Sequence, residues 1–338
     1  MTSVGIIGAG KIGKTIAYYL EQESFQVSLA DKNHDHEYLD ATNTKHLVKF
    51  VAKNDIIVSA GPYYLNNIIA NFSVELGKAY FDLTEDIEVT NYIKRLNAKT
   101  FVMPQCGLAP GAVNIITNNL IQQFDEVETV NLRVGALPRY SINEMAYYLT
   151  WSTDGLINEY CNMCDMIING KIVQQPSMLG LETIYIDGVK YEAFNTSGGI
   201  GTLCETYQNK VKNMSYKTIR YPGHYKAMKF LVSDLNLAKN KKKFAELFNK
   251  EVPHTTDDVV IILVKVIGYK NNQLVEKTYH KKIHGNKKFS AIQKATASGV
   301  CSNIVAYNSG KLKGNGFIKQ EDVPFNIFTS NKFGKIYK

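Results

Sequence analysis

A glycine-rich hexapeptide near the start of the chain restricts the fold more than any other feature. It occupies residues 8–13, after a short apolar run at residues 3–8, and it opens a segment with apolar residues at helical spacing, Lys11 to about Gln22. In a strand–turn–helix unit of this kind, glycines permit a tight turn, close approach of the backbone to a pyrophosphate, and close packing of helix on strand. The unbonded N–H groups of the helix N-terminus attract phosphate oxygens. We therefore predict a Rossmann dinucleotide-binding turn. Its cofactor-binding residues are Gly8, Gly10, Lys11, Ile12 and Gly13.

An acidic residue follows the second predicted strand, Phe25–Ala30. At this distance from the glycines, the carboxylate of Asp31 is expected to accept a hydrogen bond from the adenosine 2′-hydroxyl and to repel a 2′-phosphate. The predicted cofactor is therefore NAD, with NADP as the less favoured alternative because Lys32 lies beside Asp31.

Helical and strand-like segments alternate through the first hundred residues. Helices are expected at Thr44–Lys53 and residues 65–76, and strands at Asp55–Ser59, Ala79–Leu83 and Thr100–Met103. Such alternation predicts an α/β domain with a doubly wound parallel sheet. Ligands bind at the carboxyl edge of such sheets. Two groups of residues end strands at this edge and are expected to face the cofactor, namely Ser59, Ala60, Gly61 and Pro62 after one strand and Asp82 at the end of the next.

The pattern changes near residue 115. Asn169-Gly170 and Asp187-Gly188 are typical of type I′ hairpin turns between β-rich runs. Strands are expected at Val127–Val134, Met166–Val173, Thr183–Ile186, Tyr191–Phe194, Val259–Ile267 and Leu274–Tyr279, and a helix at Ser290–Asn308. These segments predict a second, mostly antiparallel α+β domain. The expected organisation is a nucleotide-binding domain at residues 1–115, a second domain at 116–289, and a segment at 290–338 that returns to the first.

Charge and hydropathy argue against two classes of partner. The formal net charge is +8, but the lysine run at residues 239–243 contains no aromatic residue that would stack on a base, so we interpret it as a solvated helix face rather than a nucleic-acid site. No apolar run approaches the ~20 residues that cross a bilayer, so no membrane partner is expected. The N-terminal residues lack the order of a secretory signal, and a cytoplasmic location is the default expectation.

The five cysteines are an odd number in a long chain, which argues against a disulfide framework. Cys161 and Cys164 form a C-x-x-C in a stretch that we expect to be helical, with no second pair nearby, so no metal site is predicted. Cys106 is interpreted as a packing residue, since no activating base is apparent in its neighbourhood.

Four segments past residue 100 carry a family resemblance. They are Cys106-Gly107-Leu108-Ala109-Pro110-Gly111, residues 151–157 (WSTDGLI), residues 192–199 (EAFNTSGG) and residues 216–224 (YKTIRYPGH). In this order they resemble the saccharopine dehydrogenase-like family, most closely its short lysine 6-dehydrogenase branch. The chain is shorter than that branch, and its Thr-Trp-Ser at residues 150–152 is closer to the saccharopine reductase form.

The resemblance implies a Rossmann domain, a substrate and dimerisation domain, and hydride transfer between NAD(P) and the C–N bond of an amino acid such as lysine or saccharopine. A small-molecule amino-acid substrate and a homodimer follow as expected partners. The runner-up enzyme is a polyamine-forming reductase similar to homospermidine or carboxynorspermidine synthase. The competing class is a non-catalytic NAD-binding protein on the same scaffold.

Amine oxidation needs a hydride acceptor, a group that takes the amine proton, and anchors for the charged ends of the substrate. Arg220 is the expected carboxylate anchor because a guanidinium presents two parallel donors, with a structural ion pair as the alternative. His224 is a candidate for proton exchange near neutral pH, and Asp82 for the base or the ammonium anchor. Their alternatives are a structural histidine and a helix cap. Candidates to line the substrate pocket are Tyr63, Glu144, Trp151 and Thr196.

Overall fold

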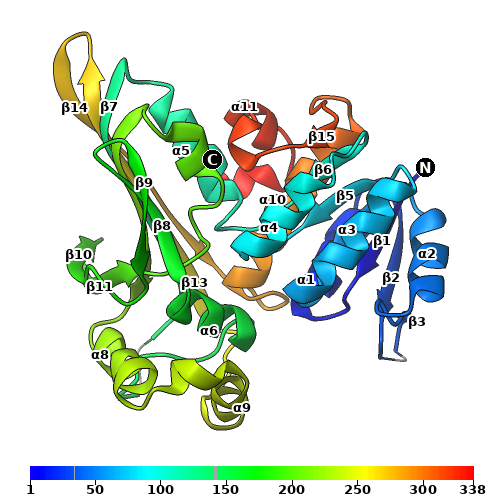
Figure 1. The fold of residues 1–338 in the computed structure, drawn as a ribbon, viewed down its shortest axis with the longest axis horizontal. Helices are drawn as coiled ribbons and strands as arrows, with labels where there is room; N and C mark the ends of the chain where they lie inside the picture. Colours follow the sequence, from blue (N-terminus) through cyan, green and yellow to red (C-terminus); the bar gives the residue numbers. More distant parts are fainter. Residues whose placement is uncertain (34, 141–142) are drawn as a thin grey trace. The chain divides into compact units, whose positions relative to one another are not determined.

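The computed structural model describes residues 1–33, 35–140 and 143–338. Within it the chain forms two compact units, and each is described by itself (Figure 1). The first unit comprises Met1–Ile115 and Gln293–Lys338, and the second comprises Ile116–Ile292. The chain passes from one unit to the other within two helices, α5 (Ala112–Ile121) and α10 (Ala291–Asn308). Among the described residues, no helix is both long and apolar enough to cross a membrane.

A parallel sheet forms the centre of the first unit, as the alternation of elements predicted. Its strand order is β15-β6-β5-β4-β1-β2-β3, and every neighbouring pair runs parallel. The strands are β1 (Thr2–Ile7), β2 (Phe25–Asp31), β3 (Glu37–Tyr38), β4 (Ile56–Ser59), β5 (Ala79–Asp82), β6 (Phe101–Met103) and β15 (Gly316–Phe317). The order reverses at β1, so the carboxyl ends of β1 and β4 form the switch point where doubly wound sheets bind ligands.

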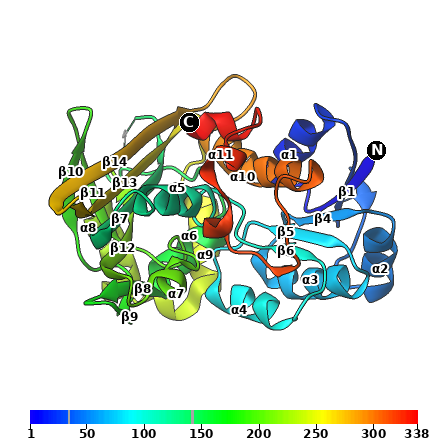
Figure 2. The ribbon, with the colours of Figure 1, turned by 90° about the horizontal axis from the view of Figure 1, so that it is seen from above.

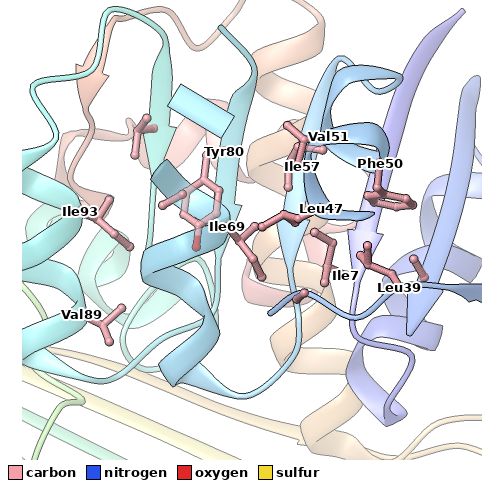
Figure 3. Close-up of a cluster of buried hydrophobic side chains, with 14 residues drawn as sticks. Ile7, Leu39, Leu47, Phe50, Val51, Ile57, Ile69, Tyr80, Val89 and Ile93 are labelled. Carbon is pink, nitrogen blue, oxygen red and sulfur yellow. The ribbon is translucent and has the colours of Figure 1, made fainter. Parts of the chain in front are cut away.

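Helices cover both faces of this sheet. In Figure 2, α1 and α10 lie on one side of the strands and α2, α3 and α4 on the other. The first four helices are α1 (Lys11–Glu21), α2 (Thr44–Ala52), α3 (Asn66–Glu75) and α4 (Ile87–Arg95). Figure 3 shows the buried apolar cluster on the α2–α4 side, which includes Leu47, Ile57 and Ile93. Burial of such side chains against the sheet is the main force that holds the layers together.

The C-terminal part of the chain belongs to the first unit. After α10, strand β15 pairs with β6 in parallel, with Gly316 opposite Phe101. Short helical turns complete the segment, namely η4 (Gln320–Asp322), α11 (Phe325–Phe328) and η5 (Gly334–Tyr337). The edge of the nucleotide-binding sheet is therefore built from residues more than two hundred positions apart.

The second unit contains a mixed sheet that is mostly antiparallel. Its order is β10-β11-β12-β7-β13-β14, with the β8–β9 hairpin attached to β12, and only the β7–β12 pair among the described strands is parallel. The strands are β7 (Glu126–Pro138), β8 (Met163–Ile168), β9 (Lys171–Pro176), β10 (Glu182–Ile186), β11 (Val189–Asn195), β12 (Val211–Arg220), β13 (Asp258–Lys270) and β14 (Gln273–His284).

Both predicted hairpin turns are present. Asn169, Gly170, Asp187 and Gly188 have φ angles of 49°, 79°, 50° and 76°, the left-handed values that a type I′ turn requires at both central positions. The prediction of one strand at Met166–Val173 is wrong, because the turn at Asn169-Gly170 divides that segment into β8 and β9.

The second unit also contains helices, and three of them contribute Leu156, Met228 and Phe248 to an apolar cluster with Phe194 of β11. The helices are α6 (Thr153–Cys161), α7 (Leu203–Tyr207), α8 (His224–Lys229) and α9 (Lys241–Glu251), and α8 continues as a π-turn, η2 (Phe230–Asp234), before the 3₁₀ turn η3 (Leu237–Asn240). The lysine run is exposed on η3 and α9, as a solvated helix face predicts. The C-x-x-C is not wholly helical, since α6 ends at Cys161 and Cys164 lies in β8.

Candidate functional site

The glycines of the predicted phosphate turn differ in what surrounds them. Gly8 has φ +111°, and a Cβ atom there would lie 2.5 Å from the backbone nitrogen of Gly61. A Cβ on Gly13 would lie 1.8 Å from the carbonyl oxygen of Gly8, so only glycine lets α1 approach the turn this closely. A Cβ on Gly10 would meet nothing within 4 Å. Gly8 and Gly13 are thus required by the fold, whereas Gly10 borders open space.

The N-terminus of α1 beside Gly10 retains unbonded donors. Gly10 is the N-cap and supplies no side chain, and the first backbone bond of the helix runs from Lys14 N–H to the Gly10 carbonyl at 3.0 Å. In the described chain, the N–H groups of Lys11, Ile12 and Gly13 have no hydrogen-bond partner. Free N–H groups at a helix N-terminus, next to a glycine without a side chain, fit a pyrophosphate.

Asp31 ends β2 beside this turn. Its Oδ2 accepts the Ala9 N–H at 2.7 Å and its Oδ1 accepts the Asn33 N–H at 3.0 Å. Burial raises the pKa of this carboxyl, but backbone N–H donors outweigh that effect and the net pKa is lowered, so the group is ionised at neutral pH. A carboxylate has about four acceptor sites, so capacity remains for a ribose hydroxyl. The neighbouring Lys32 ammonium lies 3.7 Å from the Asp40 carboxylate.

The segment after β4 closes over the glycine turn. The Ala60 N–H donates to the Ile7 carbonyl at 2.8 Å, and Gly61 meets Gly8 through its backbone. Ser59 is buried, and its hydroxyl donates to Oδ1 of Asn66 at 2.7 Å, so this hydroxyl is turned into the protein. Pro62 then begins a 3₁₀ turn, η1 (Tyr63–Leu65), in which the half-buried Tyr63 ring packs on the apolar cluster of the first unit.

Asp82, at the carboxyl end of β5, is fully buried. Its Oδ1 accepts the N–H groups of Thr84 and Gln105 at 3.0 and 2.9 Å, and its Oδ2 accepts the Tyr80 hydroxyl at 2.9 Å. Burial raises its pKa to about 6, although these three donors favour the ionised form and limit the shift. The carboxyl therefore titrates close to neutral pH while it ties together the loops after β5 and β6.

A second carboxyl on the same loop was not singled out by the sequence. Burial raises the pKa of Glu85 to about 7, with a further contribution from the charges of Asp86 and Asp82. Glu85 directly precedes Asp86, the N-cap of α4, and this position gives no sequence signal of its own. Cys106, on the loop after β6, is fully buried; its N–H donates to the Asp82 carbonyl at 2.8 Å and its thiol donates to the Met103 carbonyl at 3.1 Å. Burial raises the pKa of this thiol, which remains protonated.

Arg220, at the end of β12, is 2% exposed and is the principal buried cation of the second unit. Its Nε–H donates to the Tyr160 hydroxyl at 2.8 Å and its Nη1 donates to the Ile219 carbonyl at 2.8 Å. The guanidinium carbon lies 5.3 Å from the centre of the Tyr147 ring. A guanidinium has five N–H donors, and two of those on Arg220 donate to acceptors in the described part of the chain. Three donors on a buried cation therefore remain available to another acceptor.

Polar atoms without partners occur in the same unit. Within the described residues, the buried hydroxyls of Tyr147, Thr150 and Thr196 make no hydrogen bond. Tyr147 is the residue whose ring lies against Arg220; burial raises the pKa of its hydroxyl, and the charge of Arg220 opposes that effect. A buried hydroxyl without a partner costs about 1–3 kcal/mol. Of these three residues, Tyr147 is the one that the structure places against Arg220.

His224, at the start of α8, is fully buried and has a partner at each ring nitrogen. Nδ1 lies 2.9 Å from the Met145 carbonyl, and Nε2 lies 3.0 Å from the Tyr160 hydroxyl. Burial and, to a lesser extent, the charge of Arg220 lower its pKa to about 3, so the ring is neutral at physiological pH. Arg220, Tyr160 and His224 thus come together from β12, α6 and α8.

The remaining pocket candidates lie in different environments. Trp151 is half-buried against the apolar cluster of the second unit, and Thr196 is buried just after β11. Glu144 is exposed. The described part of the chain contains no group of three or more His, Cys, Asp or Glu side chains that could hold a metal ion.

Family models match both units. The saccharopine dehydrogenase NADP binding domain matches residues 4–102, and the saccharopine dehydrogenase C-terminal domain matches residues 107–326. The chain belongs to the saccharopine dehydrogenase family. Its first unit is accordingly a pyridine-nucleotide-binding domain, which agrees with the free donors at the glycine turn.

Relatives of known name lie within the same family. Alpha-aminoadipic semialdehyde synthase from Bos taurus is 22% identical over 312 residues, which cover 83% of this chain and 33% of the relative. The Mus musculus protein of the same name is 23% identical over 292 residues, or 77% of this chain and 31% of the relative. The chain therefore spans about one third of the length of these relatives.

Solved structures show the same fold. Saccharopine dehydrogenase (L-Glu forming) from Saccharomyces cerevisiae has a TM-score of 0.79 at 15% identity, with 98% of this chain and 96% of that chain covered. C. glutamicum DAP dehydrogenase has a TM-score of 0.53 at 10% identity, with 99% and 98% covered.

Gly10, which borders open space, and Gly13, which packs against the Gly8 carbonyl, provide a matched test of the nucleotide site. Gly10→Ala places a methyl group in the space beside the free N–H groups, so we expect the dissociation constant of NAD⁺ to rise at least about tenfold with an unchanged melting temperature. Gly13→Ala forces a clash with a carbonyl oxygen and should cost about 1–3 kcal/mol or more of stability. Calorimetric titration and thermal unfolding measure both effects, and undiminished nucleotide affinity in Gly10→Ala would remove this turn from the site.

The raised pKa of Asp82 makes the free energy of unfolding depend on pH in a predictable direction. As pH rises from about 4 to 6, the unfolded chain releases this proton first, so the wild type should lose stability relative to Asp82→Asn, by about 3 kcal/mol at about 1.4 kcal/mol per pKa unit. Asparagine keeps an oxygen for the Thr84 and Gln105 N–H groups but does not titrate. Urea unfolding of both proteins across this pH range measures the difference, and a pH-independent difference would contradict the prediction.

Proposed function

We propose that the protein is a pyridine-nucleotide-dependent oxidoreductase that acts on the C–N bond of an amino acid of the saccharopine class. The observation that carries the proposal is Arg220, a buried guanidinium with three unused N–H donors in a unit that also contains three unsatisfied hydroxyls. Burial of a cation is costly unless partners compensate it, and the Tyr160 hydroxyl and the charge of the buried Glu159 do so only in part. A substrate carboxylate is the partner that matches both the charge and the planar donor geometry.

The names of similar proteins support the same substrate class. The curated relatives are named for alpha-aminoadipic semialdehyde, and the structural neighbour with the TM-score of 0.79 is named for saccharopine and L-glutamate. Two further structures with TM-scores of 0.55 and 0.53 carry the names of D-amino acid and DAP dehydrogenases. These names share an amino acid as the compound acted on, and saccharopine is itself an amino acid with several carboxylates.

The chemistry assigns separate tasks to the two units. A bound nicotinamide supplies the hydride acceptor for oxidation or the hydride for reduction. Residues 10–13 and Asp31 would hold the nucleotide, and Arg220 would hold a substrate carboxylate. Loss of the amine proton requires a group that titrates near neutral pH, and Asp82, with its pKa raised to about 6, meets this condition. Within the second unit, Trp151 and Thr196 are the residues that we propose to line the substrate site.

We also propose which of the two cofactors, NAD or NADP, the protein prefers. We favour NAD, because the ionised Asp31 would repel a 2′-phosphate and Lys32 is directed to Asp40. The family domain that matches this region is nevertheless described as NADP-binding, so the choice depends on this chain's own residues. The expectation that the protein is a cytoplasmic homodimer belongs to the same proposal, and its mass in solution will test the dimer.

Substitution of Asp31 separates charge from hydrogen bonding. Asp31→Ala should weaken NAD⁺ binding more than NADP⁺ binding, since only NAD⁺ uses the carboxylate. Asp31→Asn keeps an acceptor for the Ala9 N–H while it removes the charge, and should improve the ratio of NADP⁺ to NAD⁺ affinity. Dissociation constants for both nucleotides measure these effects. Equal losses for the two nucleotides in Asp31→Ala would refute the assignment.

Turnover decides the function itself. We expect reduction of NAD⁺ at 340 nm with saccharopine. Arg220→Lys should raise KM for saccharopine at least about tenfold, because lysine cannot copy the planar pair of donors. Arg139→Lys is the matched control, since Arg139 is exposed and lies 3.8 Å from the Asp257 carboxylate. Nucleotide binding without turnover of any amine or imine substrate would favour the non-catalytic alternative, and turnover of a diamine that carries no carboxylate would favour a polyamine reductase.

A further inference from the structure

Three buried side chains of the second unit form one directional chain of hydrogen bonds. The Nε–H of Arg220 can only donate, so the Tyr160 oxygen accepts this bond at 2.8 Å. The proton of the Tyr160 hydroxyl is then directed to Nε2 of His224, 3.0 Å away. At the other end of the ring, Nδ1 lies 2.9 Å from the Met145 carbonyl, which can only accept. Each donor in this series therefore has one acceptor.

The tautomer of His224 follows from these contacts. A carbonyl next to Nδ1 requires a proton on Nδ1, and a neutral ring then has its lone pair on Nε2. The rings of Tyr147 and Phe194 lie 4.9 and 6.4 Å from the His224 ring, and the nearby charge is the guanidinium of Arg220. These surroundings favour the neutral ring, which can accept the hydroxyl proton of Tyr160.

This chain of bonds determines which edge of the guanidinium is left open. The Tyr160 oxygen occupies Nε, and the Ile219 carbonyl occupies one N–H of Nη1. One N–H of Nη1 and both N–H groups of Nη2 remain, so every unused donor lies on the two terminal nitrogens of the guanidinium. The guanidinium carbon lies over the Tyr147 ring, 5.3 Å from its centre. The end of the side chain is therefore the part presented to an acceptor.

We propose that Tyr160 and His224 are positioning residues that orient Arg220 so that its terminal edge, Nη1 with Nη2, binds a substrate carboxylate end-on. The identity of the ligand rests on the function proposed above, whereas the orientation rests on the hydrogen bonds themselves. This role differs from the proton exchange expected for His224 from the sequence, because both ring nitrogens are already engaged.

Substitutions that remove single bonds of the chain test the proposal. Tyr160→Phe keeps the ring but removes both hydrogen bonds, so we expect KM for saccharopine to rise about tenfold, with kcat within about threefold and an unchanged dissociation constant for NAD⁺. Tyr225→Phe is the matched control, because its hydroxyl donates to the Met178 carbonyl and does not contact Arg220. An unchanged KM in a folded Tyr160→Phe protein would overturn the proposal.

Two replacements of His224 separate its two nitrogens. Gln places an oxygen near the position of Nε2 and can still accept from Tyr160, whereas Asn places its amide near Nδ1 and can satisfy only the Met145 carbonyl. We expect His224→Gln to retain most of the affinity for saccharopine and His224→Asn to resemble Tyr160→Phe. Equal effects of the two replacements, with equal melting temperatures, would mean that His224 is merely structural.

Nitrogen NMR of histidine- and arginine-labelled protein provides a readout that does not depend on turnover. Wild-type His224 should show a protonated Nδ1 and an unprotonated Nε2, and the Arg220 Nε–H should exchange slowly with solvent. In Tyr160→Phe this Nε–H should exchange at least about tenfold faster. A protonated Nε2 would overturn the chain of bonds whatever the substrate is. If saccharopine is not turned over, the proposed function fails, and the NMR result still decides the orientation of Arg220.

Discussion

Removal of a guanidinium charge from water is the constraint around which the polar interior of the second unit is arranged. Arg220 is among the largest fully buried side chains of the chain, and an unpaired buried charge is too costly for a folded protein to maintain. Tyrosine rings, a hydroxyl and the charge of the buried Glu159 compensate part of that cost, and they come from segments far from Arg220 in sequence. The same partners bring His224 into the interior, where its low pKa is a consequence of burial beside a cation. Packing, tautomer and ligand preference in this region therefore have one electrostatic cause.

The features predicted correctly from the sequence depend on local backbone geometry. Three turns need backbone angles or contacts that few residue types allow: the glycine turn, Asn169-Gly170 and Asp187-Gly188. At these turns the amino-acid sequence alone indicates the structure. The alternation of elements was sufficient for the parallel sheet. At residues 166–173 the sequence contains both a strand pattern and a turn signal, and the structure forms the turn, which divides the segment into two strands.

Features that depend on partners distant in sequence could not be predicted in this way. Strand β12 was missed because polar residues interrupt its apolar alternation, and its parallel pairing with β7 is what defines it. Tyr160 belongs to none of the motifs in the sequence, although it contacts Arg220 and His224, which lie 60 and 64 residues further along the chain. Glu85 was missed because its raised pKa comes from burial, which no spacing of residues reveals. The motif at residues 216–224 singled out Arg220 and His224, whereas the direction of the hydrogen bonds that join them through Tyr160 required coordinates.

The pairing of β15 with β6 has a consequence for the synthesis of the protein. Residues 1–103 can form six strands of the nucleotide-binding sheet, but the edge of β6 has no partner until Gly316 and Phe317 have been made. An open edge strand is a site of misassociation with other chains. A ribosome-bound chain must therefore carry an incomplete nucleotide domain while the whole second unit is translated. Early binding of a nucleotide at the glycine turn, which lies far from that edge in the strand order, would stabilise the nascent domain during this interval.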